Sequence, residues 1–227
     1  MFWLERLLDR EAFMKKKVLV FSGMPASGKD TITGRLNQIN PGIVYFKKYR
    51  AIGPKDKLKD TYFNVSVEEF EKMIEQEAFI QYHGRYGRYY GIAKSTLIEL
   101  LNEDIVPIIH IGRIENYYTF IENLKEFEKQ NNLEINVIHI QLWEEKNELE
   151  RRIKKRDVNE EEVQKRICAM EQEFYDAKEM MQKQKKPFSI IIKNEDIELT
   201  CKIILECIDG SVSDDGYEEF NKYLRSI

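Results

Sequence analysis

A glycine-bounded loop near the start of the chain constrains the fold more than any other feature of the sequence. It follows the short apolar run Val18–Phe21 and matches the pattern G-x-x-x-x-G-K. Glycines let such a backbone curl until successive N–H groups point at one anion, and the helix that follows adds the positive end of its dipole. We therefore predict a nucleoside triphosphate site, with Lys29 reaching the terminal phosphates. The residues of this site are Gly23, Met24, Pro25, Ala26, Ser27, Gly28, Lys29, Asp30 and Thr31.

The position after the lysine departs from the usual pattern. Serine or threonine normally stands there and binds Mg²⁺, whereas this chain has Asp30. The hydroxyl of Thr31 is one alternative ligand, and the carboxylate of Asp30, acting through water, is another, since Mg²⁺ keeps several waters. Without a metal the carboxylate would repel the phosphates. We expect Mg²⁺ to accompany ATP, with Asp30 and Thr31 as its ligands.

Apolar runs alternate with helical patterns along the chain. The predicted strands are Val18–Phe21, Val106–Ile111, Val137–Leu142 and Phe188–Ile192. The predicted helices are Thr31–Asn40, Val67–Glu75, Glu160–Gln184 and Ile197–Ile208. This alternation is typical of an α/β domain with a parallel central sheet and helices on both faces. Residues 1–14 are interpreted as a short accessory helix, and residues 209–227 as an exposed tail.

Composition argues against several classes of function. The net charge of −4 argues against nucleic-acid binding, which needs a basic face. The apolar runs are too short to cross a membrane, and residues 1–14 carry no secretory signal. Three cysteines without metal-ligand spacing favour reduced thiols, and we expect a cytoplasmic protein.

Three stretches beyond the loop carry a family resemblance. Tyr62–Phe70, continued by Ala78–Gln81 and Tyr89–Gly91, is similar to the guanylate kinase runs D-Y-x-F-V-S-x-E-E-F, G-E-F-x-E and Y-Y-G-T. Leu149–Arg156 resembles the lid segment L-x-x-R-L-x-x-R, and Ile190–Asp196 resembles the strand end V-I-V-N-D-D near the adenine. Residues 16–208 thus resemble guanylate kinase in the order and spacing of their motifs.

The resemblance implies a P-loop three-layer α/β/α fold for residues 15–208. An inserted subdomain at about 46–92 would bind a nucleoside monophosphate, and a helical lid would span about 149–166. The implied activity is an ATP-dependent nucleoside monophosphate kinase that transfers the γ-phosphate to a nucleotide or deoxynucleotide and yields a diphosphate. Catalysis in such enzymes is mainly positioning and charge neutralisation.

The resemblance also implies roles for particular side chains. The catalytic residues would be Lys29, Arg50, Arg152 and Arg156. The acceptor-binding residues would be Arg50, Tyr62, Gln81 and Tyr90. Arg166 would join the two lid arginines, and Asn194 would lie at the ATP site. Other interpretations stay open: the tyrosines as packing residues, Arg151–Arg156 as a solvated helix face, and His110 and His139 as core or strand-end residues.

The positions that read guanine do not carry over. The base-contacting glutamate of the family aligns with Gln81, its hydroxyl residue with Ile92, and a strand aspartate with Gly112. Each lost bond to a buried guanine edge costs roughly 1–3 kcal/mol, so several losses should abolish strong guanine selection. The pattern predicts a kinase with a different or relaxed acceptor base.

The family's second phosphate arginine aligns with Gly53, and its strand acids with His110 and Gly112. Arg85 and Arg88 are candidates to replace the missing guanidinium. Two alternatives to the nucleotide kinase remain: a non-catalytic module of this fold that binds a protein, and a P-loop kinase of another small phosphorylated substrate. The intact loop argues against the first alternative, and the lost base readers argue for it.

Overall fold

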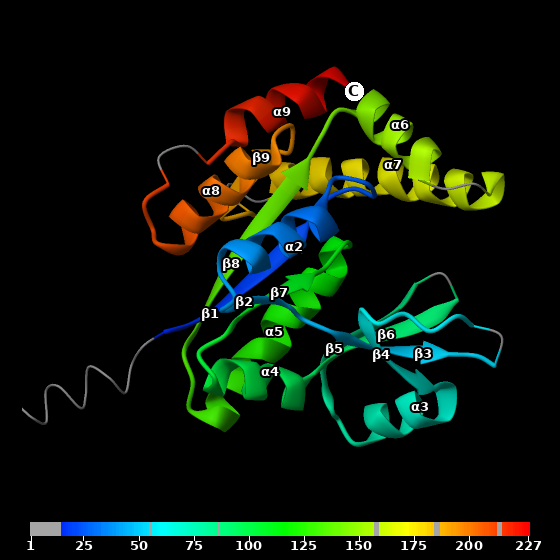
Figure 1. Cartoon of the computed structure of the whole chain (residues 1–227), viewed down its shortest axis with the longest axis vertical. Coiled ribbons are helices and arrows are strands. Elements are labelled where there is room, and N and C mark those ends of the chain that lie inside the picture. Colours follow the sequence, from blue (N-terminus) through cyan, green and yellow to red (C-terminus); the bar gives the residue numbers. More distant parts are fainter. Residues whose placement is uncertain (1–14, 55, 86, 157–158, 184–186, 213–214) are drawn as a thin grey trace, which may run out of the picture. The chain divides into compact units, whose positions relative to one another are not determined.

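The structure is a computed structural model that describes residues 15–227 except 55, 86, 157–158, 184–186 and 213–214 (Figure 1). The accessory helix predicted for residues 1–14 lies outside the described residues. Chain contacts divide the protein into two units. The first comprises the described parts of Met1–Val18, Lys47–Pro107 and Tyr118–Val137, and the second Leu19–Phe46, Ile108–Tyr117 and Ile138–Ile227.

The elements alternate along the chain as the sequence pattern predicts. The strands are β1 (Lys16–Ser22), β2 (Ile43–Tyr45), β3 (Lys48–Ile52), β4 (Tyr62–Ser66), β5 (Phe79–Arg85), β6 (Arg88–Ala93), β7 (Val106–His110), β8 (Ile135–Trp143) and β9 (Ile190–Lys193). The helices are α2 (Lys29–Ile39), α3 (Val67–Glu75), α4 (Lys94–Asn102), α5 (Ile114–Asn131), α6 (Lys146–Arg156), α7 (Glu160–Lys183), α8 (Ile197–Ile208) and α9 (Tyr217–Ser226).

The second unit is built on a five-stranded sheet in the order β2-β7-β1-β8-β9. Strands β1 and β7 pair in parallel, as do β8 and β9. The central strand β1 is fully buried from Val18 to Phe21, which explains its uninterrupted apolar run. Parallel strands place their carboxyl ends at one edge of the sheet, so Ser22 of β1 and His110 of β7 end side by side. The predicted parallel α/β sheet is confirmed.

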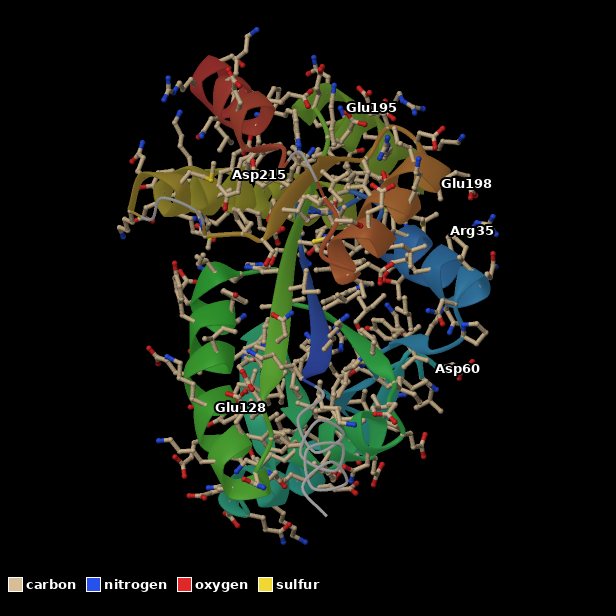
Figure 2. The ribbon with its side chains drawn as sticks, turned by 90° about the vertical axis from the view of Figure 1, so that its left-hand side faces the viewer. Arg35, Asp60, Glu128, Glu195, Glu198 and Asp215 are labelled. Atoms are coloured by element: carbon tan, nitrogen blue, oxygen red, sulfur yellow. The ribbon has the colours of Figure 1, made fainter. Side chains whose placement is uncertain are left out.

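Helices α2 and α8 of this unit pack against each other. Arg35 of α2 donates two hydrogen bonds to the carboxylate of Glu198 on α8, at 2.7 and 3.0 Å (Figure 2). The pair is exposed, so it orients the two helices more than it stabilises the fold.

The first unit contains a four-stranded sheet in the order β4-β3-β6-β5. Strands β3 and β4 are parallel, whereas β6 runs antiparallel to both β3 and β5. Helix α3 begins where the Ser66 side chain accepts a hydrogen bond from the N–H of Glu69, and its Phe70 stacks on Phe79. A Cβ at Gly91 would lie 2.5 Å from the ring of Phe79, so this position requires glycine. The sequence predicted α3 but not the antiparallel hairpin.

The expectation of an exposed tail after residue 209 is wrong. Helix α9, coloured red in Figure 1, packs over β9 and beside the start of α6. Its Phe220 and Leu224 are buried, and Phe220 contacts the ring of Trp143. Gly216 makes a turn with φ 67° that returns the chain to β9. Asp215 accepts the backbone N–H of Ile191 there.

Within the described residues, none of the helices combines the length and apolar character needed to cross a membrane.

Replacing Phe220 by Ala should lower the free energy of unfolding by about 3–5 kcal/mol, because a fully buried aromatic ring leaves a cavity beside Trp143. Lys222→Ala, an exposed change on the same helix, should stay within about 0.5 kcal/mol. Urea unfolding followed by tryptophan fluorescence measures both. A loss below 1 kcal/mol for Phe220→Ala would show that α9 does not contribute to the core.

Candidate active site

The phosphate loop joins β1 to α2 through two glycines that adopt positive φ. Gly23 has φ 138°, and a Cβ there would lie 2.1 Å from the carbonyl oxygen of Leu142. Gly28 has φ 97°, and its Cβ would lie 2.1 Å from the Asn194 side-chain nitrogen. Ala26 also takes a positive φ, of 65°. The backbone therefore makes the tight curl that the sequence predicts, and it does so where no other residue than glycine fits at both ends.

Lys29 folds back over this curl. Its ammonium donates hydrogen bonds to the carbonyls of Gly23 and Met24 and lies 3.3 Å from the Ser27 hydroxyl. Ser27 is fully buried, whereas Lys29 is half-buried. A lysine held by weak carbonyl acceptors inside the loop can exchange them for phosphate oxygens, which are stronger acceptors for a cation.

Asn194 holds the loop from the far side. Its side-chain NH₂ donates to the carbonyl of Ser27 at 2.8 Å, and its side-chain oxygen accepts from the hydroxyl of Thr200 at 3.0 Å. Its backbone N–H donates to the carbonyl of Trp143 at 2.9 Å. Because Asn194 is buried and uses both ends of its amide, it fixes the loop to β8 and to α8.

Asp30, in the first turn of α2, lies between two basic side chains of the second unit. Its carboxylate is 3.5 Å from Nδ1 of His110 and 3.8 Å from the guanidinium of Arg156. The other ring nitrogen of His110 lies 2.8 Å from the Thr33 hydroxyl, which fixes the imidazole. His110 is a strand-end residue, as expected, but the sequence did not place it beside Asp30.

Arg152 on α6 is held by two carboxylates. It donates to Glu148 at 2.8 Å and to Glu144 at 3.1 Å, and it approaches the carbonyl of Asn194 at 3.5 Å. Hydrogen bonds from Arg151 and then Arg152 lower the pKa of Glu148 to about 2. Arg152 is therefore half-buried and points toward Asn194, the residue that holds the loop, rather than into solvent. Arg166 lies half-buried on α7.

A small cavity of about 20 Å³ lies behind the loop, beside Gly23. Buried polar side chains line it, among them His139, Gln141 and Asp176. The volume suits about one water molecule, so it is not a nucleotide pocket. His139 lies 2.8 Å from the hydroxyl of Ser22, and burial lowers the pKa of its imidazole to about 3. This histidine is a neutral core residue, which agrees with its sequence interpretation.

In the first unit, three predicted acceptor residues come together. Arg50 on β3 stands opposite Tyr90 on β6 and lies with its guanidinium 5.5 Å from the ring centre of Tyr62. The rings of Tyr62 and Tyr90 are 5.5 Å apart. Arg50 is only 3% exposed and donates one bond to the carbonyl of Lys57, and among the described groups no acceptor reaches its buried Nε. A buried guanidinium with an unused donor suits an anion.

Gln81, the fourth predicted acceptor residue, is buried on β5 opposite Ile92. Its NH₂ group donates to the carbonyl of Tyr82 at 3.0 Å and lies 3.2 Å from Nδ1 of His83. The amide is thus bound to its own strand. Ile92 is fully buried and offers no polar group at the paired position.

Arg88 reaches the turn that follows β3. It donates to the carboxylate of Asp56 at 3.0 Å, and the other oxygen of that carboxylate accepts the N–H of Gly53 at 2.8 Å. Arg88, then the Gly53 N–H, and the charge of Arg50 lower the pKa of Asp56 to about 2. Asp56 therefore connects Arg88 to Gly53, the residue that aligns with the family's second phosphate arginine. Arg85 stands opposite it in the hairpin, but its side chain lies outside the described residues.

The structure brings the predicted residues together in two separate groups. Lys29, Asn194 and Arg152 connect through the loop in the second unit, where Arg156 also approaches Asp30. Arg50, Tyr62 and Tyr90 form the other group, in the first unit. The sequence missed the contacts that Glu144 and His110 make in the site, and it missed Asp56. The strand-end position of the first two, directly after β8 and at the end of β7, was the available signal, since polar residues there border the ligand edge of a parallel sheet. Asp56 gave none.

These features define the protein as a P-loop α/β phosphotransferase. The family model "Guanylate kinase" matches residues 15–211. The guanylate kinase of Prochlorococcus marinus subsp. pastoris is 24% identical over 198 residues, covering 85% of this chain and 97% of that protein. The guanylate kinase of Fusobacterium nucleatum is 28% identical over 202 residues, covering 85% and 96%. The crystal structure of guanylate kinase from Anaplasma phagocytophilum shares the fold, with a TM-score of 0.59 at 19% identity over 95% of this chain and 98% of that one.

The chain belongs to the guanylate kinase family. It is an ATP-dependent nucleoside monophosphate kinase of the guanylate kinase type.

His139 makes the stability of the fold depend on pH. The folded pKa of about 3 lies below the unfolded value of 6.5, so acidification below pH 6.5 protonates only the unfolded chain and removes stability until pH 3. Between pH 7 and 5.5 the loss should be about 1 kcal/mol. His139→Gln keeps an amide donor toward Ser22 but cannot titrate, so its free energy of unfolding should lack this part of the pH dependence. Equal slopes for the two proteins in urea unfolding would contradict the assignment.

Proposed function

We propose that this kinase holds ATP on residues 23–31, binds the acceptor phosphate with Arg50, Tyr62 and Tyr90, and does not select guanine. The observation that carries the acceptor site is the buried guanidinium of Arg50, whose Nε has no acceptor among the described groups and which lies against two tyrosines. Arginine donors with nearby phenol hydroxyls recognise a phosphate through several hydrogen bonds at once.

On the ATP side, four residues of the second unit act on the triphosphate. Lys29 leaves its carbonyl acceptors and neutralises the terminal phosphates, and Asn194 keeps the loop curled. Arg152 and Arg156 then offset the negative charge that is spread over the transferring phosphoryl group. We include Arg166 with the lid arginines because it follows them on α7.

The donors at the start of α2 fit Mg²⁺. Asp30 has a carboxylate that is 73% exposed, and its contacts with His110 and Arg156 are longer than charge-assisted hydrogen bonds. Thr31 adds a hydroxyl, and both are the hard oxygen ligands that Mg²⁺ prefers. A bound Mg²⁺ supplies charge neutralisation and orientation of the phosphates. Among the residues that the structure describes, no group of three His, Cys, Asp or Glu side chains could hold a metal alone, so phosphate oxygens would complete the shell.

The acceptor base meets a different surface from the one that guanine needs. Guanine presents two N–H groups that a carboxylate can accept together, whereas Gln81 has one amide oxygen and its NH₂ is already used by Tyr82. Ile92 supplies no hydroxyl. A base whose recognition depends less on paired acceptors, such as a pyrimidine or adenine, suits this strand pair better.

We further propose that Arg88 supplies the second guanidinium of the acceptor phosphate site. Its partner Asp56 interacts electrostatically with Arg50, so the two arginines and the carboxylate share one local field. Asp56 orients Arg88 at Gly53, which carries no side chain of its own.

The family match favours the enzyme over a non-catalytic protein-binding module, and it favours a nucleotide over another small phosphorylated acceptor. For the compartment, the thiols of Cys168, Cys201 and Cys207 are free, and burial raises the pKa of the Cys201 thiol to about 11. Free thiols support a reducing cytoplasm.

A panel of monophosphates tests the function. With Mg²⁺ and ATP present, at least one non-guanine acceptor should give faster ADP formation than GMP does. The acceptors to test are AMP, CMP, UMP and dTMP, each as the ribonucleotide and the deoxyribonucleotide. Lys29→Ala should lower acceptor-dependent turnover by at least about 100-fold, because it removes the cation that follows the transferring charge. Coupled ADP detection measures both. If the protein binds ATP but turns over none of the acceptors, the non-catalytic protein-binding module becomes the better interpretation. A clear preference for GMP would contradict the proposal that the kinase does not select guanine.

Arg88→Ala should raise KM for the best acceptor about 10-fold and leave KM for ATP unchanged, since one charge-assisted hydrogen bond to phosphate contributes about 1.5–3 kcal/mol. Arg225→Ala, an exposed arginine of α9, is the matched control and should change neither constant. If Arg88 serves only to hold Asp56, its loss will lower the melting temperature and leave both KM values as they were.

A further inference from the structure

The C-terminal helix α9 lies beyond the residues that the family model matches, which end at 211. It nevertheless contacts the start of the lid helix α6. The hydroxyl of Tyr223 accepts the backbone N–H of Lys146, the first residue of α6, at 2.6 Å. The first N–H groups of a helix have no partner within the helix, so an oxygen from another element stabilises this end.

The same turn also orients Arg152. One oxygen of the Glu144 carboxylate accepts the backbone N–H of Glu145, and the other accepts the guanidinium of Arg152 at 3.1 Å. Glu144 is buried, with 6% of its side chain exposed. The position of the first turn of α6 therefore determines where this carboxylate holds Arg152.

Aromatic packing fixes Tyr223 in place. Its ring lies 5.0 Å from Trp143, which directly precedes Glu144, and 5.9 Å from Phe174 of α7. Phe220, one turn earlier on α9, also packs on Trp143, with the two ring centres 5.2 Å apart. The packed ring thus holds the hydroxyl of Tyr223 in place, and this hydroxyl in turn positions the junction between β8 and α6.

We propose that Tyr223 is a positioning residue for phosphoryl transfer: by accepting the N–H of Lys146 it sets the first turn of α6 and so the Glu144-bound orientation of Arg152. The inference rests on the role of Arg152 in the proposed function. It gives a part in catalysis to a helix outside the matched family residues.

Tyr223→Phe removes the hydroxyl and keeps the packed ring. It should lower kcat about five-fold at saturating substrates, while the Kd for ATP and the melting temperature change little. Tyr175→Phe removes a hydroxyl from an exposed tyrosine of α7 and is the matched control, with unchanged kcat. A purely structural role for Tyr223 would move the melting temperature and not kcat per folded molecule.

A double-mutant cycle tests the route through Arg152. The single variant Arg152→Ala should lower kcat. Adding Tyr223→Phe to Arg152→Ala should then change kcat by less than two-fold. A full five-fold loss in the Arg152→Ala background would overturn the positioning role, and so would a Tyr223→Phe kcat equal to that of Tyr175→Phe.

Hydrogen exchange gives a readout that does not depend on turnover. Amides at the start of α6, near Lys146, should exchange about five-fold faster in Tyr223→Phe than in Tyr175→Phe. Unchanged exchange would overturn the inference even in an inactive protein. Absence of turnover in the unmodified chain would instead contradict the proposed function, so the two failures are distinguishable.

Discussion

A buried hydrogen bond from the side chain of Asn194 to the carbonyl of Ser27 anchors the phosphate loop, on whose shape the rest of the site depends. The Asn194 amide occupies the space that a Cβ on Gly28 would need, so the asparagine in this position requires a glycine at 28. Asn194 also bonds to Trp143 and Thr200, and Arg152 approaches its carbonyl. One buried amide therefore links the loop, the sheet, α8 and α6. Since an unsatisfied buried amide is costly, all of these contacts must form together.

The groups that hold phosphate and those that read a base obey different physical rules. Phosphate binding needs cations and N–H donors at a fixed place, and a guanidinium such as Arg50 meets that need whichever base is attached. Base reading needs each donor and acceptor to be matched, and one amide or isoleucine in place of a carboxylate or hydroxyl leaves buried groups unpaired. The NH₂ group of Gln81 is not left unpaired, because it donates to the carbonyl of Tyr82 in its own strand. Under the proposed function, phosphoryl transfer is thus kept while the choice of acceptor base changes.

The sequence predicted the parts of the molecule that are determined locally. The loop, the buried strand β1, the parallel pairing and helix α3 follow from glycine spacing, apolar runs and helical spacing of apolar residues, and the structure has them all. Helix α9 was missed because its apolar positions, Phe220 and Leu224, become informative only once Trp143 lies beneath them. Glu144 and Asp56 were missed for a related reason: their arginine partners are 8 and 32 residues away, and only the fold sets those pairs.

Asp30 gives the loop a charge that the usual serine or threonine does not. A carboxylate one residue after Lys29 offsets the positive field that the helix dipole and the lysine create for phosphate. Its neighbours in the second unit, His110 and Arg156, partly compensate, yet both contacts are longer than a hydrogen bond and exposed to solvent on the Asp30 side. His110 and Arg156 therefore neutralise the Asp30 carboxylate only in part. A cation bound by both Asp30 and phosphate would replace the repulsion between them with attraction. Nucleotide affinity in this chain should accordingly depend on a divalent cation more steeply than in loops that carry a neutral hydroxyl at this position.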